Sequence, residues 1–424
     1  MYLTKDEERA YDGEYGWTLQ KAMQILVTIG DLNNAERLIE IESAHVSGAS
    51  YKTIGDAYEF IASLDGRVAV RTTLNPIGMD TERWREMGIS EDFARKQLSV
   101  LAAYKSLGIS AECTCIPYEL SQPKGHIAWS ESSAVIFANS VIGARTNMEG
   151  APSALAAALV GKTPLYGLHI SENRAATVKF RVNAEISDAD FGAFGMLIGE
   201  ITRDRIPLIE LRSQPSISEL KQLSAGIGAT GAVGMFHVKG ITPEAELNKD
   251  IEEVIDIENS DIMCYDACCE PDVIAIGCPH CGISELKQLY KMLRREQAHA
   301  HRDRVGCDFF VFTARSLIRS SSDPATPHRN TSSQMTGSNG GINNETERIV
   351  EKIERFGVKV FCDTCFVVSP AFERFSCIMT NSGKLLRYAP LMRDRNGKDR
   401  NRKGAEVILK STEECVRYAF HSHL

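Results

Sequence analysis

Apolar and polar positions along this chain follow two alternating periods. Segments such as WTLQKAMQILVTIG and SEDFARKQLSVLAAYKSLG repeat apolar residues every three to four positions, which predicts helices. Short runs rich in β-branched and aromatic residues follow them and predict strands, among them LIEIESAHV, VAVRTTLNP, IPLIEL, CDFFVFTA and VKVFC. Regular succession of helix and strand is typical of parallel sheets covered by helices. We therefore expect an α/β fold with mostly parallel sheets.

The length of 424 residues exceeds what one hydrophobic core usually serves, which is about 250–300 residues. We expect three α/β domains, at residues 1–145, 146–265 and 266–424. The clearest break in the pattern is residues 320–344, which are rich in Ser, Thr, Asn and Gly. This composition predicts a long surface loop, with an active-site lid as the alternative. Residues 393–404 predict a solvated turn.

Composition excludes several classes of function. The net charge of −8 disfavours a general nucleic-acid surface, which needs clustered basic residues. We expect no membrane partner, because no apolar run approaches the roughly 20 residues that span a bilayer. The polar, acidic first residues do not resemble a signal peptide, so we expect a cytoplasmic protein. Twelve cysteines in a reducing compartment favour metal ligation or catalysis over disulfides.

Three cysteines stand where predicted strands end: Cys115 in SAECTC, Cys278 in DVIAIGCPH and Cys365 in VKVFCDTC. In open α/β sheets, ligands bind beyond the carboxyl ends of the strands, so three distant segments can deliver thiolates to one crevice. Three thiolates can hold an iron–sulfur cluster and leave one iron free to bind substrate. We therefore expect a 4Fe–4S cluster with these three ligands.

Two CxxC pairs, Cys278 with Cys281 and Cys362 with Cys365, leave other interpretations open. Zinc bound by four cysteines would make the chain a non-catalytic scaffold, and a cluster with four cysteine ligands would make it an electron carrier. The pairs lie much farther apart than the usual 15–20 residues of zinc sites. Cys281 and Cys362 remain conceivable alternative ligands. The other cysteines are expected to pack as small apolar residues: Cys264, Cys268 and Cys269 in a helical segment, Cys307, Cys377 and Cys415 in cores, and Cys113 on the opposite face of the Cys115 strand.

A GxGxxG pattern is present at Gly226, Gly228 and Gly231. A dinucleotide site needs a strand before the pattern and a helix after it. Here ISELKQLSA predicts a helix before it and AVGMFHV predicts a strand after it. We do not expect a nicotinamide cofactor.

Five polar clusters lie at predicted strand ends or helix starts: HVSGASY (45–51), RTTLNPIGMD (71–80), AWSESSA (128–134), NSVIGARTNMEG (139–150) and NSGK (381–384). Their hydroxyl, amide and backbone N–H groups can bind a carboxylate or phosphate. We interpret four histidines as structural residues: His45, His126, His169 and His280. No Ser-His-Asp arrangement can be assembled, so the catalytic base need not be on this chain.

At these same residues the sequence resembles the aconitase X family. The resemblance covers nearly the whole length, and it is carried by HVSGASY, TTLNPIGMD, CIPYE, HIAWSESSAVIFANSVIGARTN, GLHISE, GAVGMFHVKGITPEA, GCPH, CDTCFVVSP and NSGK. It implies an aconitase-like fold of several α/β domains around a central iron–sulfur cleft. It also implies a hydro-lyase that dehydrates (R)-mevalonate 5-phosphate to trans-anhydromevalonate 5-phosphate in a modified mevalonate pathway of isoprenoid synthesis. The alternative substrate is cis-3-hydroxy-L-proline.

The resemblance further implies that the chain is a large subunit. Its expected partner is a small swivelling subunit that carries the catalytic serine, in a heterodimer or higher heteromer. We therefore assign no base here. The candidate substrate residues are Gly48, Ala49, Ser50, Asn75, Pro76, Glu131, Ser132 and Lys384. Lys384 is the candidate for pairing with an anionic group, and Arg145 is a second cation.

Overall fold

The computed structural model describes residues 1–246, 248–262, 269–319, 339–392 and 404–422. Its helices are α1 (Lys5–Asp12), α2 (Trp17–Leu32), α3 (Tyr51–Ile54), α4 (Tyr58–Ser63), α5 (Glu91–Ser106), α6 (Ser132–Phe137), α7 (Ala151–Val160), α8 (Asp190–Thr202), α9 (Ile217–Thr230), α10 (Ile283–Ala300), α11 (Arg315–Ile318), α12 (Asn339–Arg355), α13 (Gly383–Tyr388) and α14 (Thr412–His421). Its strands are β1 (Leu38–Glu40), β2 (Ser43–Val46), β3 (Arg71–Leu74), β4 (Ala128–Trp129), β5 (Lys162–Pro164), β6 (Ala176–Val182), β7 (Pro207–Glu210), β8 (His237–Val238), β9 (Asn248–Ile257), β10 (Val273–Cys281), β11 (Asp308–Thr313), β12 (Lys359–Cys362), β13 (Cys377–Thr380) and β14 (Glu406–Leu409).

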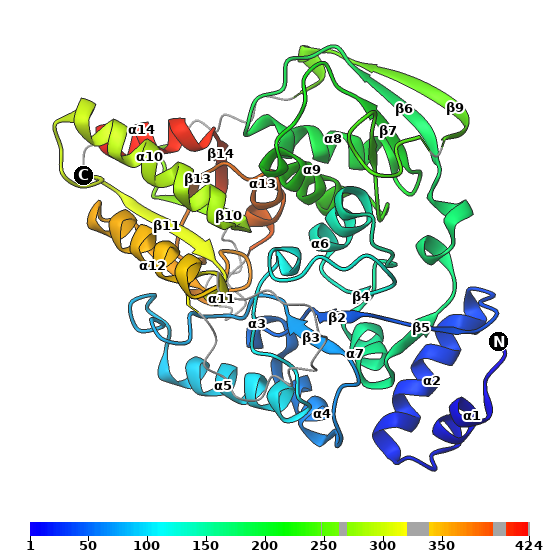
Figure 1. Ribbon diagram of the computed structural model, residues 1–424. Coiled ribbons are helices and arrows are strands. Elements are labelled where there is room, and N and C mark those ends of the chain that lie inside the picture. The colour runs from blue at the N-terminus through cyan, green and yellow to red at the C-terminus, as the bar shows by residue number, and fades with distance from the viewer. Residues whose placement is uncertain (247, 263–268, 320–338, 393–403, 423–424) are drawn as a thin grey trace.

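Three of the sheets are parallel throughout, which confirms the predicted fold class. Their strand orders are β3-β2-β4, β8-β7-β6-β9 and β12-β11-β10-β13-β14. A two-stranded sheet of β1 and β5 is antiparallel. The three parallel sheets occupy separate regions of the molecule, with α6, α9 and α13 between them (Figure 1). The predicted domain boundaries at 145 and 265 stay predictions.

Helix α9 connects these regions, because it packs against α6, α8 and α13. Glycines allow its close approach to α8. A Cβ at Gly226 would lie 2.3 Å from the Gly192 carbonyl oxygen, and one at Gly195 would lie 2.5 Å from that of Leu223. The GxGxxG pattern therefore lies within α9 and at its C-terminal end, before β8, where its glycines serve helix packing.

The strand predicted over SAECTC is wrong. Cys113 makes only an isolated bridge to Leu74, and Cys115 lies in irregular backbone. Pro117, which cannot donate a backbone hydrogen bond, begins a short 3₁₀ turn two residues later. Cys278 was predicted at the end of a strand, but it lies inside β10. The regular pairing of β10 with β11 stops at Ile276, two residues before Cys278.

The expectation that Cys269 and Cys377 are free packing residues is also wrong, because they form a disulfide. The backbone N–H of Asp272 donates to the Cys377 carbonyl at 2.8 Å, which places the segment before β10 beside the start of β13. Cys269 and Cys377 lie far apart in the sequence, so the sequence did not indicate that they are neighbours. Cys264 and Cys268 lie outside the described residues.

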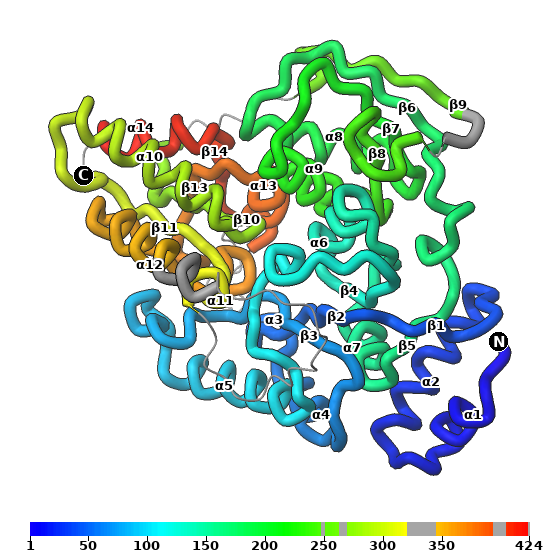
Figure 2. Tube along the Cα trace, viewed as in Figure 1, coloured from blue at the N-terminus to red at the C-terminus, as the bar shows by residue number. Residues whose placement is uncertain are grey.

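Part of the predicted 320–344 loop is helical, since residues 339–344 begin α12. The polar composition of these residues predicted a loop, but they form the first turns of the helix whose apolar periodicity is clear in ETERIVEKIER. Residues 320–338 and 393–403, where a loop and a turn were predicted, lie outside the described residues. Along the described parts of the chain, shown as a tube in Figure 2, helices with the length and apolar character of a membrane span are absent.

Candidate functional site

Three buried thiols lie close enough to affect one another's ionisation. Burial raises the pKa of Cys115, and Glu131 and Cys365 raise it further. Burial raises the pKa of Cys278 to about 12, and Cys365 is the next cause. Because electrostatic interactions inside a protein weaken with distance, Cys365 lies near both Cys115 and Cys278.

Backbone N–H groups face two of these sulfurs. Cys115 Sγ accepts from the backbone N–H of His280 at 3.1 Å. Backbone N–H groups of Val368 and Val367 lower the pKa of Cys365, whereas the Ser382 hydroxyl donates to the backbone carbonyl oxygen of Cys278. Burial still dominates, so all three pKa values remain raised. Donors aimed at sulfur stabilise thiolates and are typical of iron–sulfur ligation.

The two alternative cysteines lie in other surroundings. Burial and the Glu285 carboxylate raise the pKa of Cys281, which is the last residue of β10 and packs in a hydrophobic core. Burial and Asp363 raise the pKa of Cys362. The CxxC pairs therefore do not present four thiols to one point.

Among the described residues, no three His, Cys, Asp or Glu side chains converge as ligands of one metal ion. A structural zinc site requires such convergence. Cysteines that hold a cluster bind different irons, so their sulfurs need not meet at a point. The three thiols are the donor type that iron–sulfur clusters take, and their assignment as cluster ligands stays a prediction.

Beside the thiols, Lys384 Nζ forms a buried ion pair with Glu131 Oε1. Burial raises the pKa of Glu131, but Lys384, with smaller contributions from Ser133 and Asn75, lowers it to about 2. Burial lowers the pKa of Lys384, yet Glu131, Cys278 and Cys115 raise it above its usual value. Both groups are therefore charged at neutral pH. Their positions follow from the starts of α6 and α13, where Ser382 caps α13.

Polar atoms without partners surround this pair. Asn75 Nδ2 donates to Glu131 Oε2 at 2.8 Å, while Asn75 Oδ1 is buried without a hydrogen-bond partner in the described structure. His45 is fully buried, its Nδ1 lies 2.8 Å from Thr73 Oγ1, and its Nε2 has no hydrogen-bond partner there. Burial lowers the pKa of His45 to about 4, against the effects of Glu131 and of the neighbouring Asn75 side chain. His45, Asn75 and Glu131 therefore form one buried polar group beside Lys384.

His280 joins two of the cysteine segments. Its Nε2 lies 2.7 Å from the Thr364 carbonyl oxygen, and its Nδ1 lies 3.2 Å from Thr114 Oγ1. Burial lowers its pKa to about 4. The neutral imidazole thus links the residues that precede Cys365 and Cys115, in keeping with a structural role.

Arg315 joins the loop that carries Cys365 to the loop that follows strand β3. Its Nη2 lies 2.6 Å from Asp80 Oδ1, and its Nε lies 2.7 Å from Asp363 Oδ2. Asp80 Oδ2 also accepts from the Cys362 N–H at 2.8 Å. Asp363 has a positive φ of 62°, a conformation that non-glycine residues rarely adopt and that needs such support.

The structure brings only some of the predicted substrate residues to the thiols. Asn75, Glu131 and Lys384 lie there. Ser50 Oγ donates to the Val368 carbonyl at 2.8 Å, and Pro76 is followed by Ile77, whose N–H donates to Asp363. Both therefore border the Cys365 loop.

The described contacts of four other predicted residues do not involve the thiols, and their roles stay predictions. Gly48 lines an apolar pocket, and the Ala49 carbonyl accepts from Gln97. The side chain of Ser132 lies beside Gly228 of α9. Arg145 donates to Ser171 at 2.9 Å and lies 3.6 Å from Glu244, in a separate group of charges.

Sequence reasoning missed several residues that build the site. Ser133 donates to Glu131 at 2.8 Å, and its position one residue after Ser132 in AWSESSA could not show which serine faces inward. Arg315 and Asp80 are joined across 235 residues, and no local pattern indicates such a contact. Among these residues, only His280 had a sequence position that indicated the site, because it lies two residues after Cys278.

Sheets with this arrangement are found in a solved relative. The crystal structure of Thermococcus kodakaraensis aconitase X in its holo form matches with a TM-score of 0.84 and 39% identity, over 99% of this chain and 100% of that one. The fold is therefore aconitase-like. Models of the first, second and third domains of aconitase X match residues 1–172, 176–265 and 329–421. The chain belongs to the aconitase X family, as the sequence resemblance predicted.

Relatives within the family have two names. A Methanosarcina mazei protein named phosphomevalonate dehydratase large subunit is 44% identical over 99% of this chain and 97% of its own length. One of the same name from Methanothermobacter thermautotrophicus is 41% identical over 92% of this chain and 94% of its own. A cis-3-hydroxy-L-proline dehydratase from Hypocrea jecorina is 31% identical, and the match covers 65% of that protein.

Proposed function

We propose that this chain is the large subunit of a phosphomevalonate dehydratase, a hydro-lyase that converts (R)-mevalonate 5-phosphate to trans-anhydromevalonate 5-phosphate. Full-length relatives that carry this name support the reaction. The structural observation that carries the proposal is the proximity of three buried thiols to the Lys384–Glu131 ion pair. This arrangement combines sites for a cluster and for an anionic substrate.

Cys115, Cys278 and Cys365 would hold a 4Fe–4S cluster. When bound, the cluster would supply an iron without a protein ligand, a Lewis acid suited to a hydroxide leaving group. The backbone N–H groups of His280, Val367 and Val368 would stabilise the thiolates without adding a charged group.

Lys384 would orient the substrate through its carboxylate or phosphate. Its ammonium is already charged and nearly enclosed, so it can pair with an anion without being desolvated again. Glu131 fixes the position of Lys384, and Asn75 and Ser133 fix that of Glu131.

The base that removes the α-proton would come from a smaller partner subunit. With a pKa of about 2, Glu131 is too weak a base for a weakly acidic C–H group. His280 uses both ring nitrogens in contacts with Thr114 and Thr364. The "large subunit" names of the relatives imply such a partner.

Dehydration of cis-3-hydroxy-L-proline is the second candidate. It shares the same elimination chemistry, but the relatives with that name are more distant and longer than this chain. An anaerobic assay of the iron-loaded chain with the candidate small subunit would compare both substrates. We expect turnover of mevalonate 5-phosphate only, and none by either subunit alone. Turnover of hydroxyproline in preference would overturn the assignment.

A further inference from the structure

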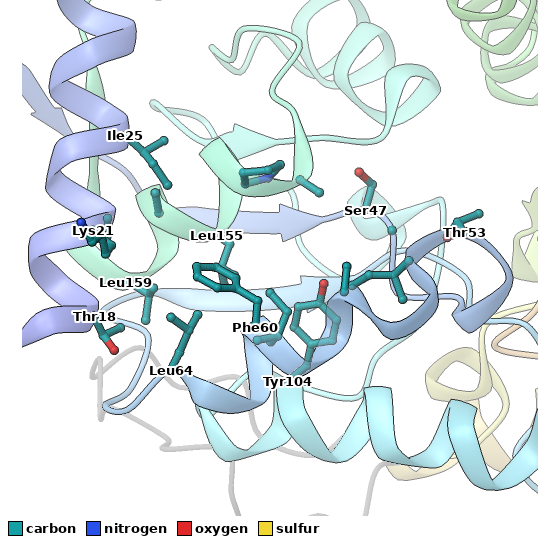
Figure 3. Close-up of a pocket in the computed structure, with 18 residues that line it drawn as sticks. Thr18, Lys21, Ile25, Ser47, Thr53, Phe60, Leu64, Tyr104, Leu155 and Leu159 are labelled. Carbon is teal, nitrogen blue, oxygen red and sulfur yellow. The ribbon is translucent and has the colours of Figure 1, made fainter.

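The segment 47–54, which includes three of the candidate substrate residues, contacts two different parts of the molecule. Ser47 and Thr53 line one end of an apolar groove (Figure 3). Other side chains of the segment contact residues 367–369, in the loop that carries Cys365. The segment is therefore in direct contact with the loop of one candidate cluster ligand.

Lys52 binds the backbone of that loop. Its Nζ donates to the Val367 carbonyl at 3.0 Å and to the Ser369 carbonyl at 3.3 Å. The Ser50 hydroxyl donates to the carbonyl between these two, that of Val368, at 2.8 Å. Three consecutive carbonyl groups of the loop thus accept hydrogen bonds from one short segment.

The N–H groups of the same peptide units face Cys365. A peptide unit joins the carbonyl of one residue to the N–H of the next, so the unit that binds Lys52 through the Val367 carbonyl presents the Val368 N–H. Burial raises the pKa of Cys365, and the Val368 N–H is the first of the groups that lower it. The Ser369 N–H donates to the Cys365 carbonyl at 3.3 Å. Lys52 and the Cys365 sulfur therefore lie at opposite ends of one peptide unit.

A charge at the oxygen end of a peptide unit affects the hydrogen bond at its N–H end. Consecutive hydrogen bonds polarise one another, so an ammonium at the carbonyl oxygen makes the N–H a stronger donor. Lys52 also forms an ion pair with Glu373 Oε1 at 2.8 Å, and the two side chains are only 13% and 14% exposed. Water therefore screens these charges little, and both affect the donor strength of the Val368 N–H.

We propose that Lys52 is a positioning residue, which orients and polarises the Val367–Val368 peptide so that its N–H stabilises a cluster-bound Cys365 thiolate. This inference rests on the proposed function, because it takes Cys365 as a cluster ligand. Hydrogen bonds to the ligating sulfurs and nearby charges set the reduction potential of an iron–sulfur cluster. A thiolate stabilised in this way donates less electron density to its iron, which makes the iron a stronger Lewis acid.

The reduction potential of the full chain after anaerobic reconstitution, titrated with dithionite and followed by electron paramagnetic resonance, tests the proposal. Lys52→Met removes a positive charge and should favour the oxidised cluster about tenfold, which lowers the potential by about 59 mV for one electron. Glu373→Gln removes the opposing negative charge and should raise the potential, and it tests the proposal even where Lys52→Met does not fold. A purely structural role would weaken the fold in both variants without moving the potential in opposite directions.

Lys162→Met is the matched control, because Lys162 pairs with Glu7 of α1 at 2.7 Å. It should lower the free energy of unfolding and leave the potential unchanged. A wild-type potential in both Lys52→Met and Glu373→Gln, or shifts in the same direction, would refute the role of Lys52 and leave the dehydratase assignment intact. Preferred turnover of hydroxyproline would refute that assignment and leave the potential shifts intact. A chain that takes up no cluster would refute both.

Discussion

Lys384 on α13 and Glu131 at the start of α6 form an ion pair across 253 residues of sequence, and their side chains are only 13% and 10% exposed. The pair joins two regions of the fold beside Cys115 and Cys278. Neither charge could be left alone there without cost.

Replacing Lys384 by Met tests whether this pair serves the substrate. We expect kcat/KM to fall at least about 100-fold, because an electrostatic partner of the substrate is lost. The free energy of unfolding should fall by about 3 kcal/mol, because Glu131 is left unpaired. Adding Glu131→Gln should restore most of the stability but not the activity. Iron content should remain unchanged, and normal kinetics in Lys384→Met would remove this residue from the site.

Arg315 is expected to hold the Cys365 loop in place. Arg315→Ala would leave Asp80 and Asp363 without their shared partner. Iron should pass to a chelator about 10–100-fold more readily, as when groups that support metal ligands are lost. Arg319→Ala, on an exposed arginine that pairs with Glu82 and Glu347, is the matched control. Equal iron retention in both variants would show that the clamp is not needed.

Stability should depend on pH through buried neutral histidines. Burial lowers the pKa of His169 to about 3, and His126 and Arg174 lower it further. Between the usual value of 6.5 and 3, the unfolded chain binds a proton that the folded chain does not. Stability is therefore full above pH 6.5 and decreases as the pH falls toward 3. His169→Gln should flatten this dependence in urea unfolding experiments, whereas His299→Gln, at an exposed position, should not. Identical pH profiles would contradict the prediction.

The α8–α9 contact should not tolerate a methyl group. Gly226→Ala places a Cβ 2.3 Å from the Gly192 carbonyl oxygen, and we expect a loss of about 1–3 kcal/mol in unfolding free energy. Gly150→Ala is the control, since its nearest neighbour would lie at 3.7 Å and its φ is −80°. A Gly226→Ala variant as stable as wild type would show that the helices separate easily.

The sequence predicted the parts of the fold that depend on periodicity. Helices such as α2 and α5 and the strands β7, β11 and β12 lie where apolar spacing placed them. The predictions failed where contacts are long-range. The Cys269–Cys377 disulfide joins residues 108 apart, and Cys115 leaves the strand pattern because its segment turns into the site.

The candidate site was predictable to the same extent. Cys115, Cys278, Cys365 and Lys384 were proposed from sequence and resemblance; Lys384 lowers the pKa of each thiol, and the roles of all four stay predictions. Arg145 was chosen for its charge, but its partners are Ser171 and Glu244. Charge can be read from a sequence, whereas the direction in which a side chain points depends on packing that the sequence does not display.

The most direct test of the account is the iron content of five cysteine variants after anaerobic reconstitution, measured together with the electron paramagnetic resonance of the cluster after reduction with dithionite. Ser at Cys115, Cys278 or Cys365 should each abolish the normal signal and most of the bound iron. Cys281→Ser and Cys362→Ser are matched controls, equally buried and in the same CxxC pairs, and should retain both. Full iron and an unchanged signal in two of the first three variants, or their loss in the two controls, would contradict the proposed cluster site.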